Sequence, residues 1–424
     1  MSSKWERKKL SDICLLITKG STPTTYGFEF IDHRHDATMF IGAYNCSIDG
    51  TAKTDTKKWI CPNANKLLKR SILNEGDSVF CIVGNTIGSS FSVNKDILPA
   101  NINQNVALIR PDRTALTPQY LHYLLRSSHI QTQVIKEAST QAQPSLSLKQ
   151  IGEFEVSLPP LPEQTKIAKI LSTWDKAIAT TERMLANSQQ QKLALMQQLL
   201  TGQKRFTEFN GEWKSVTLIN LGDTFTGLKG KTKDDFGIGH PYIPYINIFK
   251  NSAIDTNAFD YVKIESSENQ SEVQFGDIFF TTSSETPEEV GMSSVLLEQV
   301  SHVYLNSFCF GFRLFDFKNL IPEYARYLLR SEFMRKSISE LAQGATRYNL
   351  SKKQLMQLEL LLPPIPEQQK IAQVLATADA ETANLQAQLA KLRLEKKALM
   401  QQLLTGQRRV GLDDEAAAPI RRVG

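Results

Sequence analysis

Few residues of this 424-residue chain have the types and spacing that catalysis or metal binding requires. Gly230-Lys231-Thr232 has the form of the end of a phosphate-binding loop, but Phe225 stands where that loop needs its first glycine. His33 and His35 could share a metal ion on a strand, but no second group of ligands accompanies them. We therefore expect a basic turn at 230–232 and a solvated loop around the two histidines.

The acidic residues also indicate no catalytic site, and a methyl-transfer motif is missing. Asp77 and Asp277 each follow a glycine and precede an apolar run, which is typical of a turn that enters a strand. No second acidic pair recurs in both halves of the chain to hold a divalent ion. The LPPLP and LPPIP segments (158–162 and 362–366) lack the Asp/Asn-Pro-Pro-aromatic motif of adenine methyltransferases. We therefore expect no catalytic residue, metal or cofactor in this chain.

The composition is that of a globular protein, with 41% hydrophobic and 22% charged residues, which argues against disorder. No apolar run reaches 18 residues and the amino terminus lacks a signal-peptide core, so we expect a cytoplasmic protein without a membrane span. The five cysteines form no C-x-x-C pair, so we expect them to be reduced. The net charge of +5 is compatible with a nucleic-acid partner but does not demand one.

An internal repeat dominates the organisation of the chain. Residues 158–171 (LPPLPEQTKIAKIL) recur at 362–375 (LPPIPEQQKIAQVL), and residues 192–205 recur almost unchanged at 396–409. Both matches have an offset of 204, and this offset holds back to Tyr120. Each half of the chain is therefore a variable region followed by a well-matched one.

The well-matched segments predict two long helices. Each follows a proline, Pro162 or Pro366, and continues without proline or glycine to Gly202 or Gly406, where a left-handed cap is expected. Apolar positions alternate steps of four and three, as in a coiled-coil seam, which predicts an antiparallel pair within the chain. Two amphipathic helices packed separately on their own domains are the alternative. The apolar seam positions are Leu171, Trp174, Ile178, Leu185, Leu195 and Leu199 in the first helix, and Leu375, Leu385, Leu389, Leu392, Leu399 and Leu403 in the second.

The variable regions predict mixed α/β domains. Each contains β-type runs bounded by turns, such as MFIGAYN and NVALIRP in the first and DIFFTTSS and FCFGFRLF in the second. A short helix is expected after Pro118 and after Pro322. The expected fold class is α+β with an internal pseudo-two-fold repeat. Its segments are two similar globular domains at 1–157 and 207–361, spacer helices at 158–206 and 362–409, and a flexible tail at 410–424.

The duplicated blocks L-P-P-[LI]-P-E-Q-x-x-I-A-x-[IV]-L and A-L-M-Q-Q-L-L-T-G-Q-[KR]-R closely resemble the DNA-specificity subunit (HsdS) of type I restriction-modification systems, up to about Arg409. The resemblance implies two target-recognition domains, each reading one half of a bipartite asymmetric site in double-stranded DNA. It implies that the helices set the spacer and dock two methyltransferase subunits, which restriction subunits then join. S-adenosylmethionine, ATP and Mg would belong to those partners. A coiled-coil scaffold whose globular domains bind proteins is the alternative.

Candidate DNA contacts are polar side chains for base edges and cations for phosphates. In the first domain they are Lys57, Lys58, Asn85, Gln104, Asn105, Gln141 and Gln143. The second domain holds more acidic than basic residues, so a local patch is needed. Its candidates are Lys229, Lys231, Lys233, Lys250 and Arg347. Gln143 and Arg347 align across the repeat, in a segment where ATRYNLS is similar to the family's G-x-T-[QR]-x-N-L pattern and AQPSLS departs from it.

Overall fold

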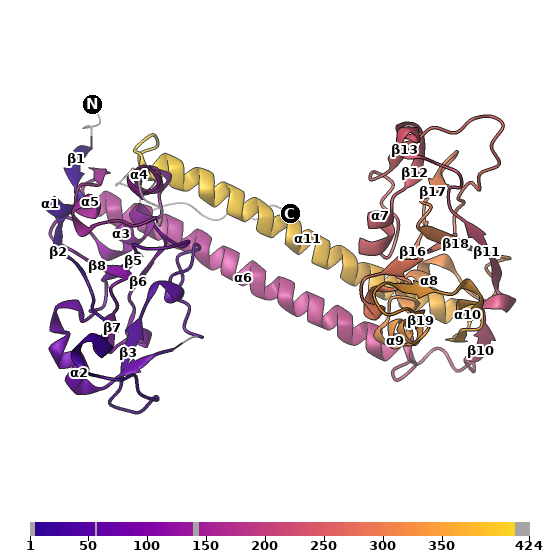
Figure 1. Ribbon diagram of the computed structural model, residues 1–424, viewed down its shortest axis with the longest axis horizontal. Coiled ribbons are helices and arrows are strands. Elements are labelled where there is room, and N and C mark those ends of the chain that lie inside the picture. Colours follow the sequence, from indigo (N-terminus) through magenta and orange to yellow (C-terminus); the bar gives the residue numbers. More distant parts are fainter. Residues whose placement is uncertain (1–4, 56, 139–143, 412–424) are drawn as a thin grey trace. The chain divides into compact units, whose positions relative to one another are not determined.

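The computed structural model describes residues 5–55, 57–138 and 144–411. The chain divides into two compact units, residues 1–182 with 388–424 and residues 183–387. Each unit holds one globular domain and part of each of two long helices (Figure 1). The first unit is discontinuous in sequence, because the carboxyl-terminal part of the second helix returns to it.

The two long helices are α6 (Leu161–Leu200) and α11 (Ile365–Leu404), with 40 residues each. A proline stands at the second position of each helix, where a missing N–H costs nothing. Gly202 and Gly406 follow the helix ends with φ of 71° and 73°, the left-handed conformation that closes a helix. The two long helices that the repeat predicted are therefore confirmed. Among the described residues, no helix combines the length and the apolarity needed to cross a bilayer.

Within each unit the two helices run antiparallel. In the first unit Arg393 donates to Glu182 at 2.7 Å, and Lys396 bonds to Asp175. Residue numbers therefore rise along α11 as they fall along α6. The contacts in the second unit follow the same order. The predicted antiparallel pair is confirmed, and separately packed helices are not what the structure contains.

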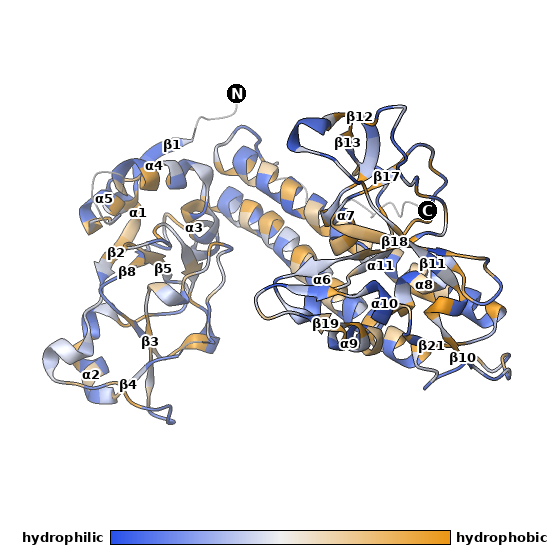
Figure 2. Ribbon diagram, turned by 45° about the vertical axis from the view of Figure 1, so that its right-hand side comes forward, coloured by the Kyte–Doolittle hydropathy of each residue, from blue (hydrophilic) through white to orange (hydrophobic). Residues whose placement is uncertain are grey.

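The seam between the helices is apolar at its ends and partly polar between them. Leu171 and Leu375 are fully buried, whereas the buried positions nearer the middle include Thr181 and Ser188. Hydrophobic and hydrophilic residues alternate along both helices (Figure 2), as an amphipathic pair requires. Of the predicted apolar positions, Leu171, Leu199, Leu375, Leu385, Leu389 and Leu403 are buried, and Trp174, Ile178, Leu185, Leu195, Leu392 and Leu399 are half-buried.

The first globular domain has two lobes. The proximal lobe, next to the helices, contains the four-stranded antiparallel sheet β2–β8–β5–β6, and the distal lobe contains the three-stranded sheet β4–β3–β7. Its strands are β1 (Glu6–Lys9), β2 (Cys14–Lys19), β3 (Thr38–Ile41), β4 (Trp59–Ile60), β5 (Ser78–Cys81), β6 (Ser90–Ser92), β7 (Ala100–Ile102), β8 (Val106–Pro111) and β9 (Glu155–Leu158). Its helices are α1 (Leu10–Ile13), α2 (Pro62–Leu67), α3 (Pro118–Leu125), α4 (Ser128–Ala138) and α5 (Leu148–Gly152).

The second globular domain repeats this plan, with β11–β18–β14–β16 in the proximal lobe and β13–β12–β17 in the distal lobe. Its strands are β10 (Lys214–Thr217), β11 (Gly222–Thr226), β12 (Phe236–Ile243), β13 (Asp260–Val262), β14 (Ile278–Thr281), β15 (Ser283–Ser284), β16 (Ser293–Val295), β17 (Tyr304–Leu305), β18 (Cys309–Leu314), β19 (Ala342–Gln343), β20 (Tyr348–Leu350) and β21 (Glu359–Leu362). Its helices are α7 (Tyr245–Lys250), α8 (Pro322–Leu328), α9 (Glu332–Glu340) and α10 (Lys352–Leu355). The α+β class and the internal repeat are thus confirmed.

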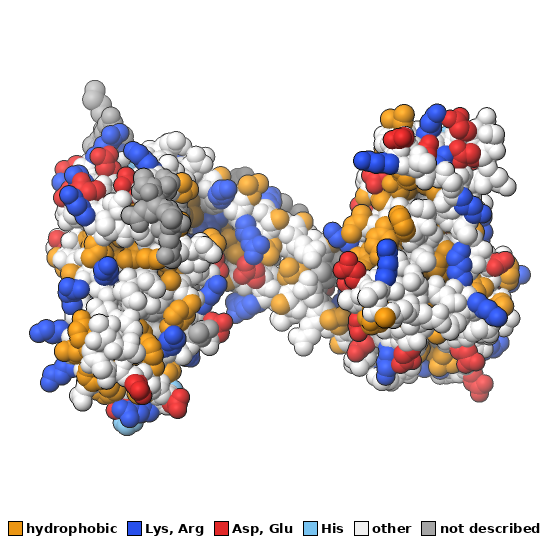
Figure 3. All heavy atoms as spheres, viewed as in Figure 1, with side chains coloured by type: hydrophobic (Ala, Val, Ile, Leu, Met, Phe, Trp, Pro, Cys, Tyr) orange, Lys and Arg blue, Asp and Glu red, His pale blue; other side chains and the backbone are white. Residues whose placement is uncertain are grey.

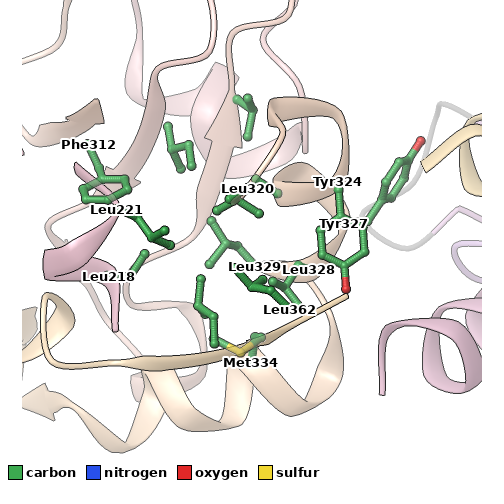
Figure 4. Packing of buried hydrophobic residues seen from close by; sticks show 14 of the residues in the cluster. Leu218, Leu221, Phe312, Leu320, Tyr324, Tyr327, Leu328, Leu329, Met334 and Leu362 are labelled. Carbon is green, nitrogen blue, oxygen red and sulfur yellow. The ribbon is translucent and has the colours of Figure 1, made fainter. Parts of the chain in front are cut away.

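The hydrophobic core of each proximal lobe continues onto the ends of the long helices. In the second unit, side chains from the sheet, from α8 and α9 and from the strand before α11 converge, as Figure 4 shows for Phe312, Met334 and Leu362. Leu199 of α6 and Leu375 of α11 belong to the same cluster. Each fully buried side chain of this kind contributes about 1.5–3 kcal/mol. The helix ends are therefore part of the domain core and hold the domain firmly.

Candidate nucleic-acid interface

The duplicated sequence blocks form joints between the helices and the domains. In the first unit, Arg409, just beyond the end of α11, donates two hydrogen bonds of 2.7 and 2.8 Å to Glu163 in the first turn of α6. Trp5, at the start of the first domain, donates to the same carboxylate at 3.1 Å. Burial raises the pKa of Glu163, but the bonds from Arg409 and Trp5 outweigh it and lower the pKa overall. Three distant segments therefore meet at one buried carboxylate.

The second unit contains the same joint. Arg205 donates to Glu367 at 2.9 and 2.7 Å, and Trp213 donates to it at 3.2 Å. Here the arginine follows α6 and the glutamate begins α11. In the first unit the arginine follows α11 and the glutamate begins α6. The Glu of the P-E-Q block and the final Arg of the T-G-Q-[KR]-R block thus recur because they are partners.

The glutamine of each P-E-Q block secures the chain that precedes α3 or α8. Gln164 accepts from the N–H of Thr117 and donates to the carbonyls of Ala115 and Pro159. Gln368 makes the same three bonds in the second unit. Both glutamines are fully buried, so their amide groups need these partners.

Further along the helices, two carboxylates link the domains to the seam. Asp175 accepts from the hydroxyl of Tyr123 in α3 at 2.7 Å and bonds to Lys396 of α11. Asp379 of α11 accepts from Tyr327 in α8 at 2.7 Å and pairs with a lysine of α6. The well-matched part of the repeat is thus occupied by structural contacts. The candidate DNA contacts of each domain lie in the variable segments.

Three of the candidate contacts in the first domain lie on neighbouring loops at one edge of the proximal lobe, where the central strand β5 ends and the central strand β8 begins. Asn85 is exposed in the turn that follows β5. The N–H of Ile82, just before that turn, donates to the carbonyl of Asn105 at 3.0 Å. Gln104 accepts from the hydroxyl of Thr22 at 2.5 Å. The structure therefore brings Asn85, Gln104 and Asn105 together, although 20 residues separate the two loops.

The two lysines before β4 face different surroundings. Lys58 lies over the rings of Phe30 and Tyr44, with its Nζ 5.1 and 5.6 Å from the ring centroids. Lys57 lines a cleft of about 640 Å³ with Trp59 and His33. Both lysines are exposed, so both ammonium groups can reach a phosphate.

Gln141 and Gln143 lie outside the described residues. The residues that follow them pair with the loop of Asn85: the N–H of Gly84 donates to the carbonyl of Pro144 at 3.2 Å, and Val83 forms a bridge with Ser145. Residues 144–145 therefore border the edge that carries Asn85.

The second domain has the same edge with different side chains. The N–H of Phe308 donates to the side chain of Asn306 at 2.8 Å, as Asn105 does to Asn103 in the first domain. The N–H of Thr282 donates to the carbonyl of Phe308 at 3.0 Å, the counterpart of the Ile82 bond. Phe308 therefore occupies the position of Asn105. Phe308 was not among the candidates drawn from the sequence, although aligning Asn103-Gln104-Asn105 with Asn306-Ser307-Phe308 before the strands β8 and β18 reveals the match.

Arg347 reaches this edge of the second domain, where its Nε donates to the hydroxyl of Ser283 at 3.2 Å. Lys229 is exposed on the neighbouring loop, and its charge lowers the pKa of Lys352 beyond the effect of burial. Lys250 is exposed at the end of α7. Figure 3 shows Lys and Arg dispersed over the visible face of each domain, with Asp and Glu among them on both. Cations are therefore present beside this edge without forming a uniform basic patch.

Lys231 and Lys233 lie on the connection between β11 and β12. The side chain of Lys231 is only 4% exposed and bonds to Glu268 at 2.5 Å. Its hydrogen bond is the largest cause that lowers the pKa of Glu268, to about 2. Lys231 is thus already paired within the domain, whereas Lys233 is exposed. Residues 230–232 form a bend at Gly230 that leads into a single 3-10 turn at Lys233–Asp235.

The two aspartates that the sequence placed in turns before strands, Asp77 and Asp277, are paired with arginines. Asp77 is 1% exposed and accepts two hydrogen bonds from Arg110, at 2.8 and 2.7 Å. Asp277 and Arg313 form the same pair. His33 packs its ring 4.4 Å from that of Trp59. Across the described parts of the chain, no group of three or more His, Cys, Asp or Glu could hold a metal ion.

Comparison with known proteins identifies the family. The family described as the type I restriction modification DNA specificity domain matches residues 2–187 and again residues 210–394. The chain belongs to this family. It is 25% identical over 376 residues to the type I restriction enzyme MjaVIII specificity subunit of Methanocaldococcus jannaschii, which covers 81% of each chain.

Solved structures share the fold of this member of the specificity-domain family. The HsdS subunit from Thermoanaerobacter tengcongensis has a TM-score of 0.55 and 19% identity, covering 96% of this chain and 98% of that chain. A solved chain of a type I R-M system has a TM-score of 0.62 and 19% identity, covering 96% and 99%. The resemblance drawn from the duplicated blocks and the DNA-specificity function are confirmed. The alternative of a protein-binding scaffold is not favoured.

Proposed function

We propose that this chain is the non-catalytic DNA-reading subunit of a type I restriction-modification complex and that each globular domain reads one half of a bipartite asymmetric site. One observation carries the proposal. The turns at Asn105 and Phe308 have the same backbone hydrogen bonds but present different side chains. Two readers with one scaffold and different side chains suit two half-sites of different sequence.

The helices are the proposed spacer and the docking surface for two methyltransferase subunits, which restriction subunits join. Their outer faces carry exposed apolar side chains, Met184, Leu193 and Leu394, which a partner could cover. S-adenosylmethionine, ATP and Mg are assigned to those partners, and the complex to the cytoplasm. Because the basic surface of the chain is dispersed, DNA affinity should rise when the methyltransferase binds.

The experiment is to express the chain with its methyltransferase and to map the methylated adenines across a genome. The expected pattern is one bipartite sequence with an unread spacer. Asn105→Ala should relax one half-site and leave the other intact, since loss of a good base contact costs about 1–3 kcal/mol of discrimination. Glu75→Ala, exposed before β5 at the opposite end of that strand from Asn85, is the control and should leave the pattern unchanged. Methylated adenines without a shared bipartite sequence would contradict the proposal.

A further inference from the structure

Phe308 is a large apolar side chain held out at a candidate DNA-reading edge. It lies in the turn between β17 and β18, and it is 60% exposed. Among the described residues, none of the hydrophobic clusters of either unit includes it. The side chain of Phe308 therefore contributes nothing to the hydrophobic core of the domain.

Hydrogen bonds hold the backbone of the turn that carries Phe308. Its N–H is bonded to the Asn306 side chain at 2.8 Å, and its carbonyl accepts from Thr282 at 3.0 Å. The N–H of Cys309 donates to the carbonyl of Asn306 at 3.1 Å. With both backbone groups of Phe308 fixed, only the rotation of its side chain remains free. A ring presented by a fixed backbone loses little conformational entropy when it binds.

Cations lie on the segments next to Phe308. Thr282, which donates to the carbonyl of Phe308, also accepts the N–H of Leu350 from β20. β20 pairs with β15, where Ser283 accepts from Arg347. Lys352 follows β20 and has its Nζ 5.2 Å from the ring of Phe310, two residues beyond Phe308. A backbone phosphate held by such cations would bring base edges toward the ring.

The chemistry of the ring restricts what it can read. A phenyl group offers no hydrogen bond, and the apolar feature among base edges is the 5-methyl group of thymine in the major groove. At the equivalent position of the first domain, the amide of Asn105 suits hydrogen bonding to a base edge. The two domains therefore differ in the kind of base feature that this position can recognise.

We propose that Phe308 is a specificity-determining residue that contacts the 5-methyl group of a thymine in the half-site read by residues 207–361. This proposal rests on the proposed function. It requires that half-site to contain a T·A pair at which the methyl group, and not only the pairing, contributes to recognition. The half-site of the first domain should not depend on a thymine methyl group through Asn105.

The test uses the full complex with its methyltransferase and duplexes that carry the mapped site. Each thymine of the site is replaced in turn by deoxyuridine, which lacks only the 5-methyl group. One replacement in the half-site of the second domain should weaken binding about fourfold, the expected effect of losing one buried methyl contact. Phe308→Ala should remove this difference between thymine and deoxyuridine, and Phe308→Leu should keep most of it.

Phe315→Ala is the matched control, since Phe315 is a 70% exposed phenylalanine of the same domain outside this edge. It should leave the fourfold difference unchanged. The proposal is overturned if every deoxyuridine duplex binds the unaltered complex as tightly as thymine does, or if Phe308→Ala keeps the difference. Failure of the proposed function would look different, because no bipartite methylation site would be found at all.

Discussion

The two globular domains share one plan but fasten their distal lobes differently. In the second domain, Arg330, two residues beyond α8, donates to the carbonyls of Ile248 and Asn251 at 2.6 and 2.8 Å, with further bonds to Phe249 and Ser293. These carbonyls belong to α7, the segment after it and β16. Burial is the main cause that lowers the pKa of Arg330 to about 10. One guanidinium thus ties α7 and the residues after it to the proximal lobe.

In the first domain, the matching residue Arg126 is held less fully. Its guanidinium meets a ring nitrogen of His122 at 3.1 Å, and within the described part of the chain its Nε is buried without an acceptor. Gly50 lies against it: a Cβ there would come within 2.4 Å of the Arg126 Cζ. Identical residues at matched positions of a repeat can therefore have different structural importance. The surroundings, which vary, decide how much each arginine contributes.

The largest effect on stability should come from placing a charged residue in the seam between the helices, where the two units also differ. Leu389 is 7% exposed in the first unit, whereas its repeat counterpart Leu185 is half-buried in the second. Leu389→Asp should lower the free energy of unfolding by about 4 kcal/mol or more, because it removes buried apolar contacts and buries a charge. Leu185→Asp should cost about half as much. Gln386→Glu is the exposed control, and equal melting temperatures for all three variants would contradict the seam.

Truncating the two matched arginines tests the comparison directly. Arg330→Ala leaves four carbonyls without their donor and should destabilise the second domain by about 3 kcal/mol. Arg126→Ala should cost about 1 kcal/mol in the first domain. Hydrogen exchange read separately for each distal lobe would measure both. Equal losses of protection in the two distal lobes would show that Arg126 and Arg330 contribute equally to stability.

A smaller difference should appear with pH. His122 of the first domain corresponds to Arg326 of the second, and burial lowers the pKa of His122 to about 4, helped by Arg126 and Lys396 and opposed by Asp175. The unfolded chain then binds more protons than the folded one between about pH 6.5 and pH 4, so stability falls as pH falls through that window. At pH 5.5 the first domain should lose about 1 kcal/mol relative to pH 7.5. His122→Gln should flatten this dependence, and an unchanged slope in that variant would refute the assignment.

The smallest effect concerns the lysines of the two distal lobes. Lys57 is exposed, whereas Lys231 is 4% exposed and bonded to Glu268. Lys57→Ala should reduce the salt dependence of DNA binding by about one phosphate contact, and Lys231→Ala should leave it unchanged. Binding measured across a salt series would separate them, and a change of slope for Lys231→Ala would show that its pairing breaks on DNA.

The sequence by itself determined the repeat, the two 40-residue helices and their antiparallel pairing. These depend on local signals: proline and glycine at the helix ends and a sustained step of three and four residues between apolar positions. The family followed from the same blocks. The sequence also placed Asn85, Gln104 and Asn105 in loops between strands, because turn-type residues between apolar runs are visible locally.

Only the tertiary structure decided which charged and aromatic side chains are paired or buried within the fold and which are exposed to a binding partner. The partner of Glu163 stands 246 residues away, and the partner of Lys231 stands 37 residues away. No local pattern specifies such pairs, because their geometry is set by how helices and sheets pack. The exposure of Phe308, in a strand-rich segment that reads as core, was likewise settled by the hydrogen bonds that hold its turn at the surface. Periodicity is a property of the chain, whereas the neighbours of a side chain are a property of the fold.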